Sequence, residues 1–343
     1  MAHKFTNDYS ELVHKDILDA LLENLNKQHI AYGLDSHSAN AKELIKKTFN
    51  LKDSNVYFVS GGTQANMLVI SFFLKHYEGV ISCDTGHINV HETAAVEGSG
   101  YKIFTVENVN GKLTKENLLK AIKYNNSTHM VKNKMVYISN STETGSIYSK
   151  REMEELYQVC KENNLLFFVD GARLASALTS KENDMTPEEF ASLCDIFYVG
   201  GTKNGLLSGE AIVINNNLDN KEFAYHIKNK GALLAKGFVL GIQFEKMFES
   251  TLYFDLAKHA NQMADYIKDS LKKYNVETIL SPTNQIFVKS SEELSNLLIN
   301  KFSCELWEKH EGYDIIRIVT SFNTSKEDCD ELINEIKKIG GNK

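Results

Sequence analysis

The sequence has little of what marks linkers, disulfide scaffolds or membrane spans. Only two prolines, Pro187 and Pro282, occur in 343 residues, so Pro-rich linkers are absent and any domains must pack closely or share segments. The chain has five cysteines, an odd number, and no two of them have CxxC spacing. This indicates reduced thiols in a cytoplasmic protein rather than a disulfide framework or a zinc ribbon. No run reaches the ~18 apolar residues of a membrane span, and we expect no secretory signal in the polar first residues.

Positive charge is also in short supply. The chain has 38 Lys and Arg against 45 Asp and Glu, a net charge of −7. Binding to a nucleic-acid backbone needs a basic face, so we expect no nucleic-acid partner. An anionic small molecule is not excluded, because a local pocket can oppose the global sign. Apolar residues make up 42% of the chain, the composition of an ordinary globular protein, and the length allows two to three domain-sized units.

Between residues 56 and 215 the sequence alternates between short apolar runs and amphipathic segments. Near-continuous runs that end in Gly, Asp, Ser or Asn are typical of strands buried on both faces. Helices are predicted near Thr63, from Ser149, which forms a capping box with Glu152, and from Thr186, an N-cap followed by a proline and an N3 glutamate. The alternation predicts an α/β fold with a mostly parallel, seven-stranded sheet covered by helices. The seven runs begin at Val56, Gly79, Tyr101, Met135, Leu165, Ile196 and Glu210.

After residue 215 the pattern changes to that of a smaller α+β unit. Residues 223–273 are predicted to form long helices, and short strands near 285–288 and 315–320 precede a final amphipathic helix over 326–339. The first residues contain a short helix and form an arm rather than a domain. We therefore expect an N-terminal arm (1–30), a large domain (31–245) and a small C-terminal domain (246–343).

Two predicted strand ends carry groups that suit a phosphate and a heterocycle, and ligands of α/β sheets bind beyond the carboxyl ends of the strands. In SGGTQAN, residues 60–66, a helix begins directly after glycines, so its free N–H groups favour a phosphate; a plain tight turn is the alternative. In FFVDGARL, residues 167–174, Asp170 leaves the core where an aspartate could hold a protonated ring nitrogen. A helix N-cap or an internal pair with Arg173 is the alternative there.

A third strand end, YVGGTKNG over residues 198–205, supplies a lysine. Lys203 lies between glycines and can form a Schiff base if its pKa is lowered, while a surface lysine in a turn is the alternative. The interval from Asp170 to Lys203 is long enough for one crossover between strands. A phosphate cradle, an aspartate and a lysine at the ends of strands in one sheet match the needs of pyridoxal 5′-phosphate (PLP). We therefore expect the large domain to bind this cofactor.

A series of motifs along nearly the whole chain resembles a known family. Their order resembles the threonine aldolase / aromatic amino acid β-eliminating lyase family of fold-type-I PLP-dependent enzymes, and most of all the low-specificity L-threonine aldolases. The resemblance implies an aspartate aminotransferase-like fold and a homodimer or homotetramer with its active sites at the dimer interface. The motifs are FTNDYS from Phe5, YGLDSHSANAKEL from Tyr32, SGGTQANM from Ser60, GHINVHETAAVE from Gly86, ISNSTETGSIYS from Ile138, VDGARLASAL from Val169, GGTKNG from Gly200, HANQMA from His259 and IRIVTSFNT from Ile316.

The resemblance implies a role toward the cofactor for each strand-end residue. Lys203 would form the Schiff base, and Asp170 would pair with the pyridine nitrogen. Gly61, Gly62 and Thr63 would hold the phosphate.

The resemblance implies further residues around the substrate. His87 would stack on the cofactor ring and influence proton transfer at the substrate hydroxyl. Arg173 and Arg317 would bind the substrate carboxylate or the phenolate side of the ring. Tyr32 and Lys228 would reach the cofactor of a neighbouring subunit. The implied substrate-binding residues are Asn7, Tyr32, Arg173 and Arg317, and the implied cofactor contacts outside the strand-end motifs are His87 and Lys228.

These roles imply an aldehyde-lyase that cleaves the Cα–Cβ bond of β-hydroxy-α-amino acids, so that L-threonine or L-allo-threonine gives glycine and acetaldehyde. The alternatives are a PLP-dependent β-eliminating lyase that gives pyruvate and ammonia, and a non-catalytic PLP-binding protein. The base at the substrate hydroxyl is either His87 or an ordered water. We expect no metal site, because His87 and His91 lack the HExxH order of metalloproteases.

Overall fold

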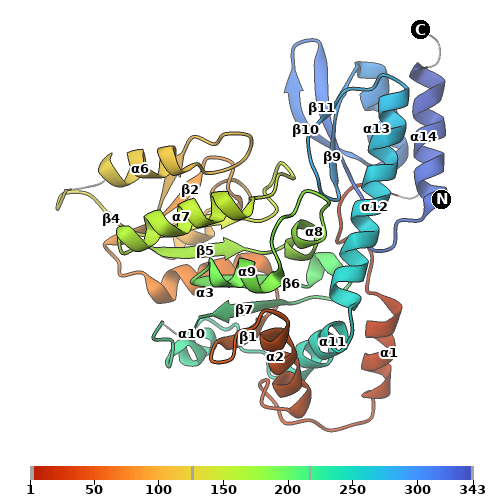
Figure 1. The fold of residues 1–343 in the computed structure, drawn as a ribbon. Coiled ribbons are helices and arrows are strands. Elements are labelled where there is room, and N and C mark those ends of the chain that lie inside the picture. The colour runs from red at the N-terminus through yellow and green to blue at the C-terminus, as the bar shows by residue number, and fades with distance from the viewer. Residues whose placement is uncertain (1–3, 125–126, 216–217, 341–343) are drawn as a thin grey trace.

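The seven predicted apolar runs pair into one sheet. The computed structural model describes residues 4–124, 127–215 and 218–340, and Figure 1 shows this sheet together with a smaller one. Its strands are β1 (Asn55–Val59), β2 (Glu78–Cys83), β3 (Lys102–Val106), β4 (Lys132–Ser139), β5 (Leu166–Asp170), β6 (Ile196–Gly200) and β7 (Glu210–Ile214). Their order is β1-β7-β6-β5-β4-β2-β3, and β7 is antiparallel to both of its neighbours while the other pairs are parallel. The prediction of a mostly parallel, seven-stranded sheet is confirmed.

Helices cover both faces of this sheet. The predicted caps are confirmed, because Ser149 with Glu152 and Thr186 with Glu189 form complete capping boxes. Each box satisfies two backbone N–H groups that a helix start leaves unpaired. The helices are α2 (Ser36–Thr48), α3 (Gly62–Phe73), α4 (His87–Val90), α5 (Ala95–Gly98), α6 (Lys115–Tyr124), α7 (Lys150–Glu162), α8 (Leu174–Leu178), α9 (Pro187–Ser192), α10 (Phe223–Asn229) and α11 (Phe238–Phe248), with a short 3₁₀ helix η1 (Thr202–Asn204).

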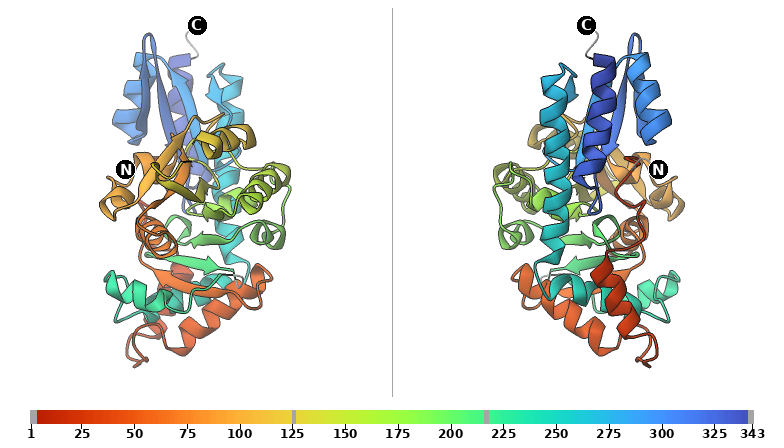
Figure 2. Two further views of the ribbon diagram at one scale, coloured as in Figure 1. Left: turned by 90° about the vertical axis from the view of Figure 1, so that its left-hand side faces the viewer. Right: turned by 90° about the vertical axis from the view of Figure 1, so that its right-hand side faces the viewer.

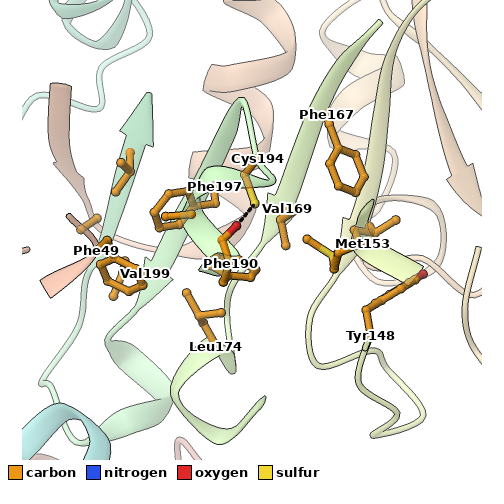
Figure 3. Packing of buried hydrophobic residues seen from close by; sticks show 14 of the residues in the cluster. Phe49, Tyr148, Met153, Phe167, Val169, Leu174, Phe190, Cys194, Phe197 and Val199 are labelled. Carbon is orange, nitrogen blue, oxygen red and sulfur yellow. Dashed lines mark hydrogen bonds between the residues drawn. The ribbon is translucent and has the colours of Figure 1, made fainter. Parts of the chain in front are cut away.

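The core divides into two apolar layers, one on each face of the sheet. Successive residues of a strand point to opposite faces, and in β5 Phe167 lies in one buried cluster while Phe168 lies in the other. The first cluster includes Phe190 and Phe197 (Figure 3), and the Cys194 thiol donates a hydrogen bond to the Phe190 carbonyl at 3.2 Å. Burial on both faces explains the continuous apolar runs, and it holds the carboxyl ends of the strands in a fixed arrangement.

The C-terminal part forms a separate antiparallel sheet. Its order is β10-β11-β9-β8, and all of its pairs are antiparallel. The predicted strands at 285–288 and 315–320 correspond to β9 and β11, whereas β8 and β10 were not predicted. The elements are α12 (Leu252–Lys273), β8 (Thr278–Ile279), β9 (Gln285–Ser290), α13 (Glu292–Phe302), β10 (Glu305–His310), β11 (Tyr313–Val319) and α14 (Lys326–Gly340).

The N-terminal segment connects the two sheets. Phe5 lies in the C-terminal core, where its N–H donates to the Phe302 carbonyl at 2.9 Å, and His14 N–H donates to the Gly205 carbonyl at 2.8 Å. Helix α1 (Lys15–Glu23) follows, and Figure 2 shows the segment running from the smaller sheet down to this helix. The domain bounds 1–30, 31–245 and 246–343 stay predictions, and residues 1–3 and 341–343 lie outside the described residues.

None of the helices in the described ranges is both long and apolar enough to cross a membrane.

Candidate active site

The first site element is the start of α3, directly after β1. Gly61 is the N-cap of α3, its backbone is extended, and no side chain caps the helix. The first N–H groups of a helix have no partner within it, and they carry the positive end of the helix dipole. A Cβ on Gly62 would lie 2.7 Å from Tyr198 Oη, while the space beside Gly61 is open. Backbone without side chains at a helix start fits a phosphate group.

The second element is the Asp170 carboxylate at the end of β5. The residue is 3% exposed, and its oxygens accept hydrogen bonds from Tyr137 Oη at 2.6 Å, Asn66 Nδ2 at 3.1 Å and the Tyr198 hydroxyl. Burial alone would raise the pKa of Asp170, but the charge on His87 and the tyrosine hydrogen bonds outweigh burial and lower it. Asp170 is therefore held as a carboxylate, which is the form that attracts a protonated ring nitrogen.

Neither alternative for Asp170 fits the geometry. The N-cap of the next helix, α8, is Arg173 rather than Asp170. Arg173 directs its Nε and Nη2 groups to Asp8, at 2.6 and 3.0 Å, and so does not form the internal pair with Asp170. Asp170 instead accepts a further hydrogen bond from the Ala172 N–H at 3.0 Å, so its carboxylate is held by neutral donors rather than by an arginine.

The third element is Lys203, which lies in η1 after β6. A Cβ on Gly200 would lie 2.3 Å from the Ala172 carbonyl oxygen, so the turn before the lysine packs directly against the chain that leaves β5. Lys203 Nζ lies 5.7 Å from the centre of the Tyr9 ring. Burial, and next the charge of Arg173, lower the pKa of Lys203. A lysine with a lowered pKa in tight backbone is suited to a Schiff base rather than to the surface.

Two arginines converge on the same region from different parts of the chain. Asp8, Arg173 and Lys203 line one cavity. Arg317 of β11 donates from Nη1 to Gln285 at 3.2 Å, and its Nη2 forms an ion pair with Glu305. Within the described part of the chain, its Nε is buried and has no hydrogen-bond partner. A buried donor without a partner is costly, so Arg317 has the capacity to take a ligand oxygen.

His87 is the first residue of α4 and belongs to a buried polar network. Its Nδ1 lies 2.8 Å from Glu92 Oε1, and Asn66 Nδ2 donates to the same oxygen at 2.7 Å. Burial alone would lower the pKa of His87, but the bond to Glu92 and the charge of Asp170 raise it. Atoms of His87, Glu92 and Asp170 lie within 4.8 Å of one another, as they also could around a metal ion. The neighbouring lysine and helix start are features of a PLP site rather than a metal site.

Asn7, Tyr32 and Lys228, the remaining predicted residues, have contacts of their own. Asn7 accepts hydrogen bonds from the Tyr9 N–H at 3.0 Å and the Ser10 hydroxyl at 2.8 Å within its own turn. Lys228 Nζ lies 4.7 Å from the centre of the Tyr32 ring. These two residues, both predicted to reach the cofactor of a neighbouring subunit, therefore contact each other at the surface.

Sequence reasoning missed several buried polar residues of the site. Asp8, next to the predicted Asn7, holds Arg173. Glu210 begins β7, accepts from the Gly201 N–H at 2.9 Å, and burial raises its pKa to about 7. Asp8 lies 165 residues from Arg173 in the sequence, whereas Glu210 lies nine residues from Gly201. A polar residue on the buried face of a predicted element, as with Asn66 in SGGTQAN, is a signal that could have found part of this network. The missed residues are Asp8, Asn66, Tyr137, Tyr198 and Glu210.

Comparison with known proteins decides the family. The model of the β-eliminating lyase family matches residues 13–293, which is more than half of the chain. The chain belongs to the β-eliminating lyase family. A curated relative is the low-specificity L-threonine aldolase of Pseudomonas sp. (strain NCIMB 10558), which is 30% identical over 329 residues that cover 93% of this chain and 93% of the relative.

Solved structures agree with the fold of this β-eliminating lyase family member. The threonine aldolase of Leishmania major is 40% identical, superposes with a TM-score of 0.96, and the match covers 98% of this chain and 99% of that one. An aspartate aminotransferase of Thermus thermophilus is 13% identical with a TM-score of 0.72, over 98% of this chain and 92% of that one, and shows the fold alone. The predicted family and the predicted aspartate aminotransferase-like fold are both confirmed.

Proposed function

We propose that this chain is a PLP-dependent lyase that cleaves the Cα–Cβ bond of β-hydroxy-α-amino acids, with L-threonine giving glycine and acetaldehyde. One observation carries the proposal: five groups from different elements converge beyond the carboxyl ends of the large sheet's strands. They are the start of α3, Asp170, Lys203, Arg173 and Arg317. The relatives named threonine aldolase, which match this chain over nearly its full length, support the same reaction.

The residues present fit the cofactor. In the proposal, Lys203 holds the cofactor aldehyde, Asp170 faces the pyridine nitrogen, and the start of α3 at Gly61, Gly62 and Thr63 holds the phosphate. When bound, PLP supplies an electron sink for the bond that breaks. The donors around Asp170 keep its carboxylate charged and fixed, which favours a protonated ring nitrogen.

The two arginines are proposed to act differently on the substrate carboxylate. Arg173 is held by Asp8, which is 1% exposed and hydrogen-bonded to Asn284 as well, so this pair is a fixed part of the site. Arg317 is paired with Glu305, whose side chain is 44% exposed and can turn away into solvent. Arg317 also has the buried Nε without a partner in the described chain. We therefore assign the main carboxylate contact to Arg317 and an orienting role to Arg173.

His87 is proposed to move the proton of the substrate hydroxyl. The carboxylate of Glu92 orients the ring through Nδ1, which leaves Nε2 as the atom that can accept a proton. The hydroxyl loses its proton as the Cα–Cβ bond breaks and the aldehyde leaves, and a proton delivered to Cα completes glycine. The hydrogen bond to Glu92 strengthens His87 as a base. Replacing Arg317 by glutamine should raise KM more than replacing His87 by asparagine, which should mainly lower kcat.

The assembly is proposed to be a homodimer or homotetramer. Large apolar side chains are exposed on and around the N-terminal segment, and such groups of residues mark interfaces. These residues are Leu12, Leu18, Leu22, Leu25, Ile30 and Leu34. In the dimer, Asn7 and Tyr32 would bind substrate and Lys228 would contact the neighbouring cofactor. Sedimentation of the holoenzyme as a monomer would rule this assembly out.

We also infer a cytoplasmic location. The five cysteines are buried free thiols, and cytoplasmic proteins keep their thiols reduced.

Product analysis tests the reaction. Holoenzyme incubated with L-threonine, L-allo-threonine and L-serine should release glycine and the matching aldehyde. Pyruvate and ammonia as the main products would instead indicate β-elimination.

Lys203→Ala should lose turnover and the visible absorbance of lysine-bound cofactor, while Lys15→Ala, a change at an exposed lysine, should leave both unchanged. Undiminished cleavage by Lys203→Ala would contradict the assignment of Lys203.

A further inference from the structure

The chain has one tryptophan, and it stands at an irregularity of the smaller sheet. Along β10 and β11, Leu306 pairs with Ile316 and Glu308 pairs with Ile315, so Trp307 is the extra residue of a β-bulge. Bulges redirect a side chain out of the regular alternation of a strand, and they are frequent next to active sites. The other residues of β10 are exposed, whereas Trp307 is partly buried.

The bulge directs the indole toward residues of the proposed site. The Arg317 guanidinium carbon lies 4.8 Å from the centre of the Trp307 ring system, and Phe287 packs edge-on against Trp307 at 5.4 Å. On another side, Trp307 lies 6.0 Å from the ring of His91, which in turn lies 5.5 Å from the ring of His87. A row of flat side chains, His87–His91–Trp307, therefore runs from the proposed hydroxyl contact to the proposed carboxylate contact.

His87 and Arg317 do not need His91 or Trp307 as hydrogen-bond partners. His87 is oriented by Glu92, and Arg317 already has Glu305 and Gln285 as partners. Burial, together with the positive charges of His87 and Arg317, lowers the pKa of His91, which favours an uncharged ring at the middle of the row. An uncharged imidazole beside an indole offers an apolar, planar surface.

We propose that Trp307, together with His91, forms the wall that receives the β-substituent of the substrate and determines which β-hydroxy amino acids are cleaved. The inference rests on the proposed function, because it places the substrate carboxylate at Arg317 and the β-hydroxyl at His87. With the hydroxyl at His87 and the carboxylate at Arg317, the β-substituent would face His91 and Trp307, which lie between these two residues. A planar β-substituent gains a ring contact there that the methyl group of threonine cannot make. The wall therefore favours substrates with an aromatic β-substituent.

Substrate comparison tests this wall. For the wild type, Trp307→Ala and Trp307→Phe, kcat/KM would be measured with L-threonine and with β-phenylserine. Trp307→Ala should lower the preference for β-phenylserine about tenfold, the size of one aromatic contact, and Trp307→Phe should keep most of it. Leu306→Ala is the matched control, because Leu306 neighbours Trp307 in β10 and is 45% exposed. Its preference should equal that of the wild type.

An equal loss of kcat/KM for both substrates in Trp307→Ala would overturn the proposal, because it would mean that Trp307 only supports Arg317 or the fold. Absence of glycine from either substrate in the wild type would instead contradict the proposed function. The two failures are thus distinguishable.

Fluorescence of the wild type provides a readout that depends neither on turnover nor on the folding of the Trp307→Ala variant. Tryptophan emission of the holoenzyme comes from Trp307 alone. L-phenylalanine, which carries a ring on Cβ, should change this emission by a larger amount than glycine, which has no β-carbon. Equal changes in Trp307 emission with both amino acids would overturn the proposal that Trp307 contacts the β-substituent.

Discussion

Replacing Asp8 by asparagine removes the charge that faces Arg173 and leaves the side-chain volume nearly unchanged. Asp8 is 1% exposed and accepts from Arg173 Nε at 2.6 Å, Arg173 Nη2 at 3.0 Å and Asn284 Nδ2 at 2.9 Å. Removing one partner of a buried ion pair leaves the other charge uncompensated, which costs about 3–5 kcal/mol. We expect Asp8→Asn to lose free energy of unfolding in this range near neutral pH.

Urea unfolding at several pH values measures this effect and its origin. Burial alone would raise the pKa of Asp8, but Arg173, Lys203 and the hydrogen bonds outweigh burial and lower it below its ordinary 3.8. A lowered carboxyl pKa stabilises the fold at a pH above the unfolded value, and this stabilisation is lost as the pH falls through the folded value. The difference between wild type and variant should therefore shrink in acid, below pH ~4.

Asp19→Asn is the control, because it changes the exposed pair of Lys15 with Asp19 and should leave the unfolding free energy unchanged within error. A loss below about 1 kcal/mol for Asp8→Asn, or a difference that persists undiminished in acid, would refute the reasoning.

Three further changes test separate features. Ser149→Ala removes the capping box of α7 and should cost about 1 kcal/mol of unfolding free energy, measured in urea. Gly62→Ala places a Cβ 2.7 Å from Tyr198 Oη and should weaken PLP binding in an equilibrium titration of the apoenzyme, whereas a Cβ at Gly98 meets no atom within 4 Å, so Gly98→Ala should leave binding intact. Burial raises the pKa of Glu210 from 4.5 to about 7, so ionisation of Glu210 destabilises the wild type as the pH rises through this range. The unfolding free energy of Glu210→Gln relative to wild type should then rise by up to about 3 kcal/mol between pH ~5 and ~8, and a flat difference would contradict the assignment.

The large sheet could be predicted because its strands are buried on both faces. Strands β5, β6 and β7 are buried at every position, so each leaves a continuous apolar run in the sequence. Strand β10 could not be predicted in this way. Its residues are mostly exposed and charged, and the bulge at Trp307 breaks the period of two that would mark a half-buried strand. The strand is held by its pairing with β11 rather than by its own burial.

Some residues of the candidate site could likewise be predicted from local sequence, and others could not. Asp170 ends β5 and Lys203 follows β6 within three residues, so the local sequence predicts that both lie at the carboxyl ends of the strands, where α/β sheets bind ligands. Asp8 could not be assigned to Arg173, because 165 residues separate them and the contact depends on the N-terminal segment passing between the two sheets. Tyr137 and Tyr198 were predicted only as parts of apolar strands. Their hydroxyls acquire a polar function because β4 and β6 flank β5 on either side, which no local pattern reveals.

The negative net charge of −7 does not prevent an anion site, because each of the two arginines at the site has its own acidic partner. Arg173 is paired with Asp8, and Arg317 is paired with Glu305. The charges of Asp8, Asp170 and Glu210 raise the pKa of Lys203 and so oppose the effect of burial. The two carboxylates that are paired with arginines differ in how easily they can leave. Asp8 is buried and stays with Arg173, while Glu305 is 44% exposed and can exchange with water. In the proposed function, an incoming amino acid would replace the Glu305 carboxylate with its own at Arg317, so the net charge of the site would change little when substrate binds.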